Sequence, residues 1–390
     1  MRVTHVITRL IVGGAQENTV ATVLGLRRKP DLEVKLISGP THGPEGSLES
    51  AVAQEPGLLT IVPELVRPVH PWKDLVALRK LTRLFREQQP HLVHTHSGKA
   101  GILGRLAAAK ARVPIIIHHI HGPSFGPFQG APANFIFRGA ERYAARVTTH
   151  FICTAHAMTR RYLAAGIGQP EMFTRVLSGF DLQPYEKLSN DPMRRAQLGL
   201  PPDAFVIGKI ARLFSLKGHD DLFSAFQQLL PQCPHARLLL IGDGPLREQF
   251  TTKLSAMGLT DKVVFTGLLP PQEVPRHIAI MDCLAHLSAR EALSRALPQA
   301  LAAGKPVVAY DFDGADEICL EGETGFLIRS GDVAIVADRL LKLSRDAGLR
   351  ERLGKRGREF VFANFSVERL VNEQHELYLR LARQNHLPVQ

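Results

Sequence analysis

Two loops in the sequence carry residue types that bind phosphate groups. Arg212 and Lys217 lie in the segment GKIARLFSLKGHDDL, between an apolar strand pattern and a helix pattern. Two cations at a strand end beside the start of a helix could clamp a diphosphate. Gly13 and Gly14 lie in IVGGAQENT, where glycines let an anion approach backbone N–H groups and the helix dipole adds attraction. The residue types alone also fit solvated cations in the first loop and an ordinary turn in the second.

A group of histidines raises metal binding as a second chemistry. The group consists of His94, His96, His118, His119 and His121. Side chains two residues apart in a strand lie on the same face, so His94 and His96 share one face of a strand, and His119 and His121 share one face of another. Imidazole is a ligand of zinc, but no acidic or cysteine residue lies nearby at ligand spacing. We therefore expect no metal at these positions.

These loops belong to a pattern in which short apolar strands alternate with amphipathic helices. In the first half, strands are predicted at residues 4–12, 33–38, 91–96, 114–120, 149–155 and 174–178, and helices at 17–28, 100–111 and 157–166. In the second half, strands are predicted at 205–211, 237–244, 262–267, 282–288 and 305–311, and helices at 221–230, 246–258 and 296–304. This alternation predicts parallel sheets covered by helices on both faces, with ligands beyond the carboxyl ends of the strands.

A polar, proline-bearing stretch at residues 182–203 divides the two halves and is typical of an interdomain hinge. We therefore expect an N-terminal domain at residues 1–180 and a second domain at residues 181–365, followed by a C-terminal helix at 366–390.

Composition narrows the class of protein. The chain has 390 residues, of which 45% are apolar, which is ample for two or three domains and excludes disordered and collagen-like chains. No apolar run approaches the roughly 18 to 20 residues that span a bilayer, and His5 and Arg9 interrupt any signal-peptide core. The four cysteines are widely spaced, as expected of reduced core thiols. These features favour a cytoplasmic location.

The net charge of +11 is confined to the first half of the chain. Residues 1–180 contain 22 Lys and Arg against 11 Asp and Glu, whereas residues 181–390 contain 26 of each. Such a field attracts phosphates, acidic lipid headgroups or nucleic acid, although a solubilising surface is an alternative. No nucleic-acid-binding signature occurs, and paired nucleotide-binding patterns favour small ligands, so we expect no nucleic acid partner.

Glu291 opens the segment EALSRALPQALAAGKPVV, in which Gln299 follows after seven residues. This segment resembles the Glu-x7-Glu segment of the family 4 glycosyltransferases. GKIARLFSLKG, LLLIGDGPLRE, VVFTGLL, GETGFLI and HTHSGKAGILGRLAA resemble segments of the same family. The resemblance implies an α/β architecture called GT-B. That fold has two Rossmann-like, doubly wound parallel-sheet domains facing across a cleft, and a C-terminal helix that crosses back to the first domain.

The resemblance also implies a hexosyltransferase-type activity. A sugar would move with retention of configuration from a nucleotide sugar, with UDP-sugars favoured and GDP-sugars second, to a glycan or lipid-linked acceptor. The catalytic residues would be Glu291, which bonds sugar hydroxyls, Arg212 and Lys217, which hold the diphosphate, and His121, which reaches the sugar or phosphate. Departure of the diphosphate leaves positive charge on the sugar ring, and fixed cations stabilise the leaving group. No protein nucleophile, cofactor or metal would be required.

Positions in the matching segments are assigned to donor binding. They are Gly13, Gly14, Arg212, Lys217, Gly242, Gly244, Leu268, Ala292, Leu293, Ser294 and Gln299. Gln299 replaces the second Glu of the family segment, and its amide can still accept from and donate to a ribose hydroxyl. Ala292 and Ser294 replace the usual small residues, and a positive φ at Ala292 would cost about 1 kcal/mol. Asp311 and Asp313 form an Asp-x-Asp motif like the manganese motif of the other large glycosyltransferase fold, but their position after KPVVAY predicts a polar turn.

We place the acceptor at Lys99 and Gln16, because Lys99 lies at a helix start that could hold a phosphate. The segment 122–147 places aromatic residues before arginines, a composition that suits either an anionic leaflet or a lid helix. Together with the basic first half of the chain, this segment favours a peripheral enzyme that extends a polyprenyl-linked glycan. The enzyme would lie on the inner face of the cytoplasmic membrane. A sugar-nucleotide epimerase on the same fold and a nucleotide-sugar-binding relative with little transferase activity are the alternatives.

Overall fold

The computed structural model describes residues 1–43, 46–96 and 98–387. It divides into two compact units. The first unit comprises Met1–Phe180 together with Ser366–Gln390, and the second comprises Asp181–Phe365. Each unit has its own parallel sheet and its own hydrophobic core, and each is described by itself below.

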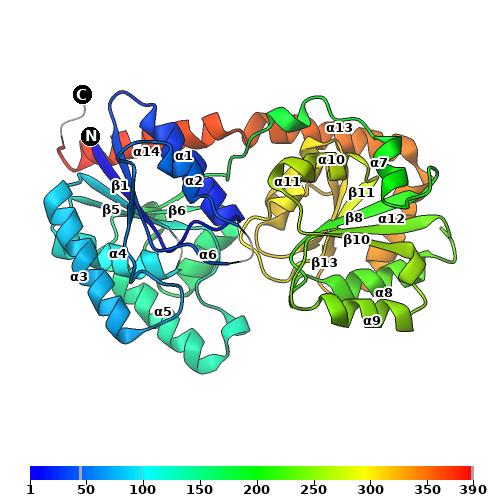
Figure 1. Ribbon diagram of the computed structural model, residues 1–390, viewed down its shortest axis with the longest axis horizontal. Coiled ribbons are helices and arrows are strands. Elements are labelled where there is room, and N and C mark those ends of the chain that lie inside the picture. Colours follow the sequence, from blue (N-terminus) through cyan, green and yellow to red (C-terminus); the bar gives the residue numbers. More distant parts are fainter. Residues whose placement is uncertain (44–45, 97, 388–390) are drawn as a thin grey trace. The chain divides into compact units, whose positions relative to one another are not determined.

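The first unit is built on a seven-stranded parallel sheet (Figure 1) in the order β3-β2-β1-β4-β5-β6-β7. The strands are β1 (Arg2–Ile7), β2 (Glu33–Ser38), β3 (Leu59–Ile61), β4 (Leu92–His96), β5 (Ile115–Ile120), β6 (His150–Cys153) and β7 (Phe173–Arg175). The order reverses beside β1, and in doubly wound sheets such a switch point is where ligands bind.

Helices cover both faces of this sheet because the strands carry apolar side chains on both sides. They are α1 (Gly14–Arg27), α2 (Glu49–Ala53), α3 (Pro71–Gln88), α4 (Gly98–Lys110), α5 (Ala131–Ala145), α6 (His156–Ala164) and the C-terminal α14 (Val367–Gln384). One core joins α1 and α14 to odd-numbered β1 positions such as Val3 and Ile7. A second core joins α3 and α4 to Val6 on the opposite face. The C-terminal helix therefore completes the first unit, as Figure 1 shows where α14 runs beside α1.

The second unit has a six-stranded parallel sheet in the order β10-β9-β8-β11-β12-β13. The strands are β8 (Phe205–Ile210), β9 (Ala236–Ile241), β10 (Val263–Gly267), β11 (Cys283–His286), β12 (Val307–Asp311) and β13 (Gly325–Arg329). The helices are α7 (Pro192–Gln197), α8 (His219–Leu229), α9 (Arg247–Ala256), α10 (Val274–Ala279), α11 (Ala296–Ala302), α12 (Val333–Arg345) and α13 (Ala347–Asn364). The loops that leave β8, β9, β10 and β11 carry the predicted donor-binding residues.

Most predicted strands match observed ones within a few residues, but two regions differ. The predicted first strand extends to residue 12, whereas β1 ends at Ile7 because the chain turns toward α1. The stretch predicted as a hinge is partly fixed to the second unit, since it contains α7 and the buried Arg195. The Arg195 guanidinium donates to the carboxylate of Asp282 at 3.1 Å and to the carbonyl of Ile280 at 2.9 Å.

Candidate active site

Two predicted catalytic residues of the second unit are in direct contact. Lys217 follows β8 and Glu291 follows β11, and the Lys217 ammonium forms an ion pair with Oε1 of Glu291. The hydroxyl of Ser288 donates to the same carboxylate oxygen at 3.2 Å. Both charged side chains keep about a quarter of their surface exposed, 23% for Lys217 and 26% for Glu291. The pair is therefore accessible to a ligand at the carboxyl edge of this sheet.

The loop that carries Lys217 is seated tightly against the end of β11. Gly218 has φ +69, and a Cβ atom there would lie 1.8 Å from the carbonyl oxygen of Leu287. The amide of Ala289 donates to the carbonyl of Leu216 at 2.9 Å. Only glycine fits position 218, because the backbone is left-handed and another chain segment occupies the space of a side chain. This packing holds the ammonium and the carboxylate at one place.

Arg212 lies in the same loop, five residues before Lys217. Its guanidinium lies 5.8 Å from the centre of the Phe214 ring. The loop after β9 packs against this segment, since a Cβ at Gly242 would lie 2.2 Å from the carbonyl oxygen of Ala211, and one at Gly244 would lie 2.5 Å from that of Leu213. The absence of side chains at these two glycines allows the loop after β9 to pack closely against the Arg212 loop.

The loop after Glu291 differs from the sequence-based expectation about strain. Ala292 is buried and does not adopt a positive φ, so alanine costs no backbone strain there. Its carbonyl accepts from the amide of Gly314 at 3.1 Å, and the Glu291 amide donates to the carboxylate of Asp313 at 3.1 Å. Asp313 thus fixes the Glu291 loop, and it lies in a turn, as the sequence predicted.

The remaining predicted donor-binding residues of this unit occupy varied surroundings. Leu268 follows β10 and is 56% exposed, so it is accessible to a ligand. Ser294 is buried and accepts from the amide of Ala296 at 3.3 Å. Gln299 lies half-buried on α11, and Leu293 is half-buried in the loop before that helix. The structure therefore brings Lys217 and Glu291 into contact but gives no comparable contact for these four residues.

Lys209 is a residue of this site that the motif analysis missed. It lies on β8, is fully buried, and its ammonium nitrogen has no hydrogen-bond partner among the described residues. Burial lowers the pKa of Lys209 to about 7, and the nearby charge of Lys217 contributes to the shift. A lysine within an apolar strand breaks the hydrophobic pattern, and this break, eight residues before Lys217, was the signal that the sequence offered.

In the first unit, the predicted residues lie at the carboxyl edge of β1, β4 and β5. Gly13 is the N-terminal cap of α1, and its φ of 173 is extended backbone that any residue adopts. Gly14 is exposed and Gln16 half-buried in the first turn of α1. Lys99, in the first turn of α4, is paired with Asp74 and donates to the carbonyl of Pro68. An acceptor phosphate at Lys99 would have to compete with Asp74. Ser97 and Gly98 at this helix start also fit ordinary helix capping by sequence, and Ser97 lies outside the described residues.

His121 follows β5 at the same edge and is half-buried. Its Nε2 atom lies 2.9 Å from Nδ1 of His96. Burial lowers the pKa of His121 to about 3, so the ring is neutral at pH 7. A neutral imidazole can donate one hydrogen bond and accept another, which suits a residue that positions a polar ligand.

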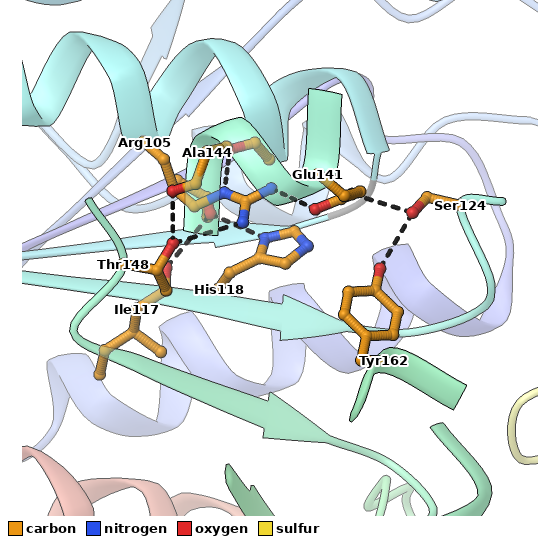
Figure 2. Close-up of polar contacts among 10 residues, drawn as sticks. Arg105, Ile117, His118, Ser124, Glu141, Ala144, Thr148 and Tyr162 are labelled. Atoms are coloured by element: carbon orange, nitrogen blue, oxygen red, sulfur yellow. Dashed lines mark hydrogen bonds and ion pairs between the residues drawn. The ribbon is translucent and has the colours of Figure 1, made fainter. Parts of the chain in front are cut away.

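A buried polar network fixes the loop that follows His121 (Figure 2). Nη2 of Arg105, on α4, lies 2.6 Å from Oε2 of Glu141, on α5, and both side chains are inaccessible to solvent. The other Glu141 oxygen accepts from the Ser124 hydroxyl at 2.9 Å, and the Tyr162 hydroxyl lies 2.9 Å from that of Ser124. Because Ser124 comes three residues after His121, the network constrains the chain next to the predicted catalytic histidine.

The histidines gather into one cluster that the sequence analysis did not foresee. The described residues contain two groups that could hold a metal, and their ring nitrogens lie within 4.8 Å of one another. The groups are His5, His94 and His96, and His96, His119 and His121. The register of neighbouring strands brings these histidines together. His5 was not among the histidines that the sequence analysis considered for metal binding. Neither group includes Asp311 or Asp313.

Across the described residues, no helix has both the length and the apolar content required to cross a bilayer.

Comparisons with protein families identify the class. The model for the glycosyl transferase 4-like domain matches residues 13–175, and the model for glycosyl transferases group 1 matches residues 190–360. HepE of Anabaena, solved in complex with UDP-glucose, has a similar structure, with a TM-score of 0.81 and 24% identity over 97% of this chain and 100% of that one. With its two parallel-sheet units, this chain has the GT-B fold and is a glycosyltransferase.

Two curated bacterial enzymes are similar over most of their length. One is the UDP-Gal:alpha-D-GlcNAc-diphosphoundecaprenol alpha-1,3-galactosyltransferase of Escherichia coli, 25% identical over 82% of each chain. The other is the capsular polysaccharide biosynthesis glycosyltransferase CapM of Staphylococcus aureus, 25% identical over 90% of each chain. Together with the two family matches, these place the chain in the family 4 glycosyltransferases.

Proposed function

We propose that this enzyme transfers a sugar, with retention of configuration, from a UDP-sugar to a lipid-linked glycan acceptor. The observation that carries the proposal is the contact between Lys217 and Glu291, which come from loops 74 residues apart and hold opposite charges at one accessible edge. A nucleotide sugar needs both charges, because its diphosphate requires a cation and its sugar hydroxyls require an acceptor.

In this proposal the ion pair opens when the donor binds. The Lys217 ammonium moves to a diphosphate oxygen with the help of Arg212, and Glu291 accepts from sugar hydroxyls. As the bond between the sugar and the phosphate breaks, the two cations stabilise the negative charge on the departing diphosphate. The acceptor hydroxyl attacks the face that the leaving group vacates, and its proton passes to a phosphate oxygen. The protein's charges replace a metal in this scheme.

Two similar proteins support UDP as the nucleotide. HepE was solved with UDP-glucose, and the E. coli galactosyltransferase acts with UDP-Gal on a diphosphoundecaprenol-linked sugar. By extension, we propose a diphosphate-linked polyprenyl glycan as the acceptor of this enzyme. Lys99 and Gln16 remain its proposed binding residues.

The outer face of α5 supports a peripheral position on an anionic membrane. Phe135, Ile136 and Tyr143 are 80%, 64% and 59% exposed and lie on one side of the helix, with Arg146 over the Tyr143 ring. Exposed aromatic and aliphatic side chains beside arginines suit the headgroup region of an anionic leaflet. Of the aromatic residues that suggested this surface in the sequence, Phe125 is instead buried.

The decisive assay incubates the full-length protein with a panel of UDP- and GDP-sugars and a diphosphoprenyl-linked sugar, and follows nucleotide release and product mass. Retention is then read from the anomeric proton coupling of the product. Transfer from a UDP-sugar supports the proposal. Interconversion of the donor sugar without transfer would indicate an epimerase, and binding without any turnover would indicate an inactive relative. Flotation with vesicles that contain or lack phosphatidylglycerol tests the membrane position separately.

A further inference from the structure

Five histidine rings line up on one face of the first unit's sheet, the face covered by α1 and α14. They are His5 on β1, His94 and His96 on β4, His119 on β5 and His121 just after it. The register pairs His5 with His94 and His96 with His119 on neighbouring strands. All except the half-buried His121 are inaccessible to solvent. Such a concentration of buried imidazoles requires an explanation, because each ring carries two polar nitrogens.

Three of these rings form a continuous hydrogen-bonded chain. Nδ1 of His5 lies 2.9 Å from Nε2 of His96, and Nδ1 of His96 lies 2.9 Å from Nε2 of His121. At the other end, Nε2 of His5 lies 3.5 Å from the hydroxyl of Tyr378 on α14, which also bonds Nδ1 of His94. The path therefore runs from the C-terminal helix to the predicted catalytic histidine.

Burial keeps these rings neutral, which limits how protons can be arranged. It lowers the pKa of His5 and of His121 to about 3, and it places the pKa of His96 well below its ordinary value. Each neutral ring has one N–H group. Each of these hydrogen bonds joins two ring nitrogens, so one of the two nitrogens must carry the N–H group. Since His96 has only one N–H group and takes part in both bonds, the N–H groups of His5, His96 and His121 must all point in the same direction.

The unpaired atom at the far end distinguishes the two directions. Nε2 of His94 is buried and has no partner among the described residues. If the N–H groups point toward Tyr378, the hydroxyl donates to His94 Nδ1 and the unpaired nitrogen of His94 is an N–H donor. If they point toward His121, His94 donates to the hydroxyl and the unpaired nitrogen is only an acceptor. Buried donors without a partner are the rarer and costlier case.

We propose that His5 and His96 are positioning residues that hold His121 in the Nδ1–H tautomer. His96 donates to Nε2 of His121, and Nδ1–H of His121, to which none of the described residues bonds, donates to an oxygen of the substrate. His121 then serves as a hydrogen-bond donor and not as a base. This rests on the proposed function and deepens it, because it names the tautomer in which the predicted catalytic histidine meets a substrate.

The test reads the tautomer directly. In full-length protein labelled with ¹⁵N-histidine, two-bond and three-bond proton–nitrogen correlations distinguish Nδ1–H from Nε2–H rings, and the His121→Gln variant assigns the signal. We expect His121 as the Nδ1–H tautomer in the wild-type protein. His96→Phe should yield mixed tautomers and lower kcat about tenfold with a smaller change in KM. His96→Asn, whose amide N–H can replace the imidazole donor, should restore the tautomer and much of kcat.

His119→Phe is the matched control. His119 is also fully buried and stacks on His121 with ring centres 3.9 Å apart, but both its nitrogens are unpaired among the described residues. The same substitution there should leave the His121 tautomer and kcat within about twofold. An Nε2–H tautomer at His121, equal losses in both Phe variants, or a stoichiometric metal ion bound to these histidines would overturn the proposal. The tautomer is measured without substrate, so the result stands even if the wild-type protein transfers no sugar.

Discussion

The buried histidines predict that the first unit loses stability at mildly acidic pH. Burial lowers the pKa of His91 and His150 in this unit, and it lowers the pKa of six further histidines on or just after β1, β4 and β5. They are His5, His94, His96, His118, His119 and His121. A depressed pKa means that the folded protein binds no proton at pH 5.5, whereas an unfolded histidine, with a pKa near 6.5, does. The stability is therefore complete above about pH 6.5 and falls as the pH drops below it.

Each such histidine contributes a loss of about 1.4 kcal/mol at pH 5.5 relative to pH 7.5. His5 and His121 together account for about 3 kcal/mol, and the six together for an upper limit of about 8 kcal/mol. Native domains are typically stable by about 5 to 15 kcal/mol, so the first unit should approach unfolding at a pH where most enzymes are stable. The second unit has two buried histidines with lowered pKa values, His219 and His286, and should be affected less.

Calorimetry at pH 7.5, 6.5 and 5.5, with hydrogen exchange to separate the two units, measures this effect. The first unit should lose protection before the second as the pH falls. The His119→Phe variant should reduce the loss between pH 7.5 and 5.5 by about 1.4 kcal/mol, because one titrating group is removed. A melting temperature that is unchanged between pH 7.5 and 5.5 in both units would refute the reasoning, because it would mean that these rings are not held neutral.

Four further predictions concern single side chains. Lys217→Ala and Glu291→Ala should each lower turnover at least about tenfold with little change in melting temperature, whereas a large loss of stability in both would make them structural residues. Lys209→Met should raise the free energy of unfolding at pH 7 by up to about 4 kcal/mol, because burial lowers the pKa of Lys209 to about 7 and the lysine must lose a proton on folding. Urea titrations measure this gain, which should become smaller toward pH 10. Gln299→Glu should change UDP affinity modestly in calorimetric titration, and abolished binding would argue against a ribose contact. Glu141→Leu should destabilise the protein by about 3 to 5 kcal/mol in denaturant unfolding, because it leaves the Arg105 guanidinium buried without its ion-pair partner, and an unchanged midpoint would contradict that account.

The sequence predicted the fold where periodicity is strong. Buried parallel strands give long apolar runs, so β2 and the strands that carry the second-unit loops were found within a few residues. Strands β3 and β13 and several helices, among them α3, α12 and α13, were not predicted. Strand β3 has only three residues, too few to show a period. In α3 the buried Ala77, Leu81 and Phe85 do recur at helical spacing, so this helix was available from the local pattern and was missed.

The sequence predicted those residues of the candidate site that come directly after a strand. Lys217 and Glu291 follow neighbouring parallel strands, and such strands bring their carboxyl ends together. The histidine chain was not predictable, because it depends on the order and register of β1, β4 and β5 and on Tyr378, which is distant in sequence. Lys209 escaped because a buried cation contradicts the hydrophobic pattern by which the strand was found.

In the proposed function, the partial exposure of the ion pair between Lys217 and Glu291 is an advantage for binding and releasing a charged donor. Both side chains are about a quarter exposed, so water already solvates part of each charge. Ion pairs with such exposure contribute about 1 kcal/mol or less, which is a small cost for a diphosphate to overcome. The pair and Ser288 already restrict the rotamers of both side chains before any ligand binds, so less rotamer entropy is lost when a ligand does bind. A fully buried pair such as Arg105 and Glu141 could not serve in this way, because separating it would leave a charge without water or a partner.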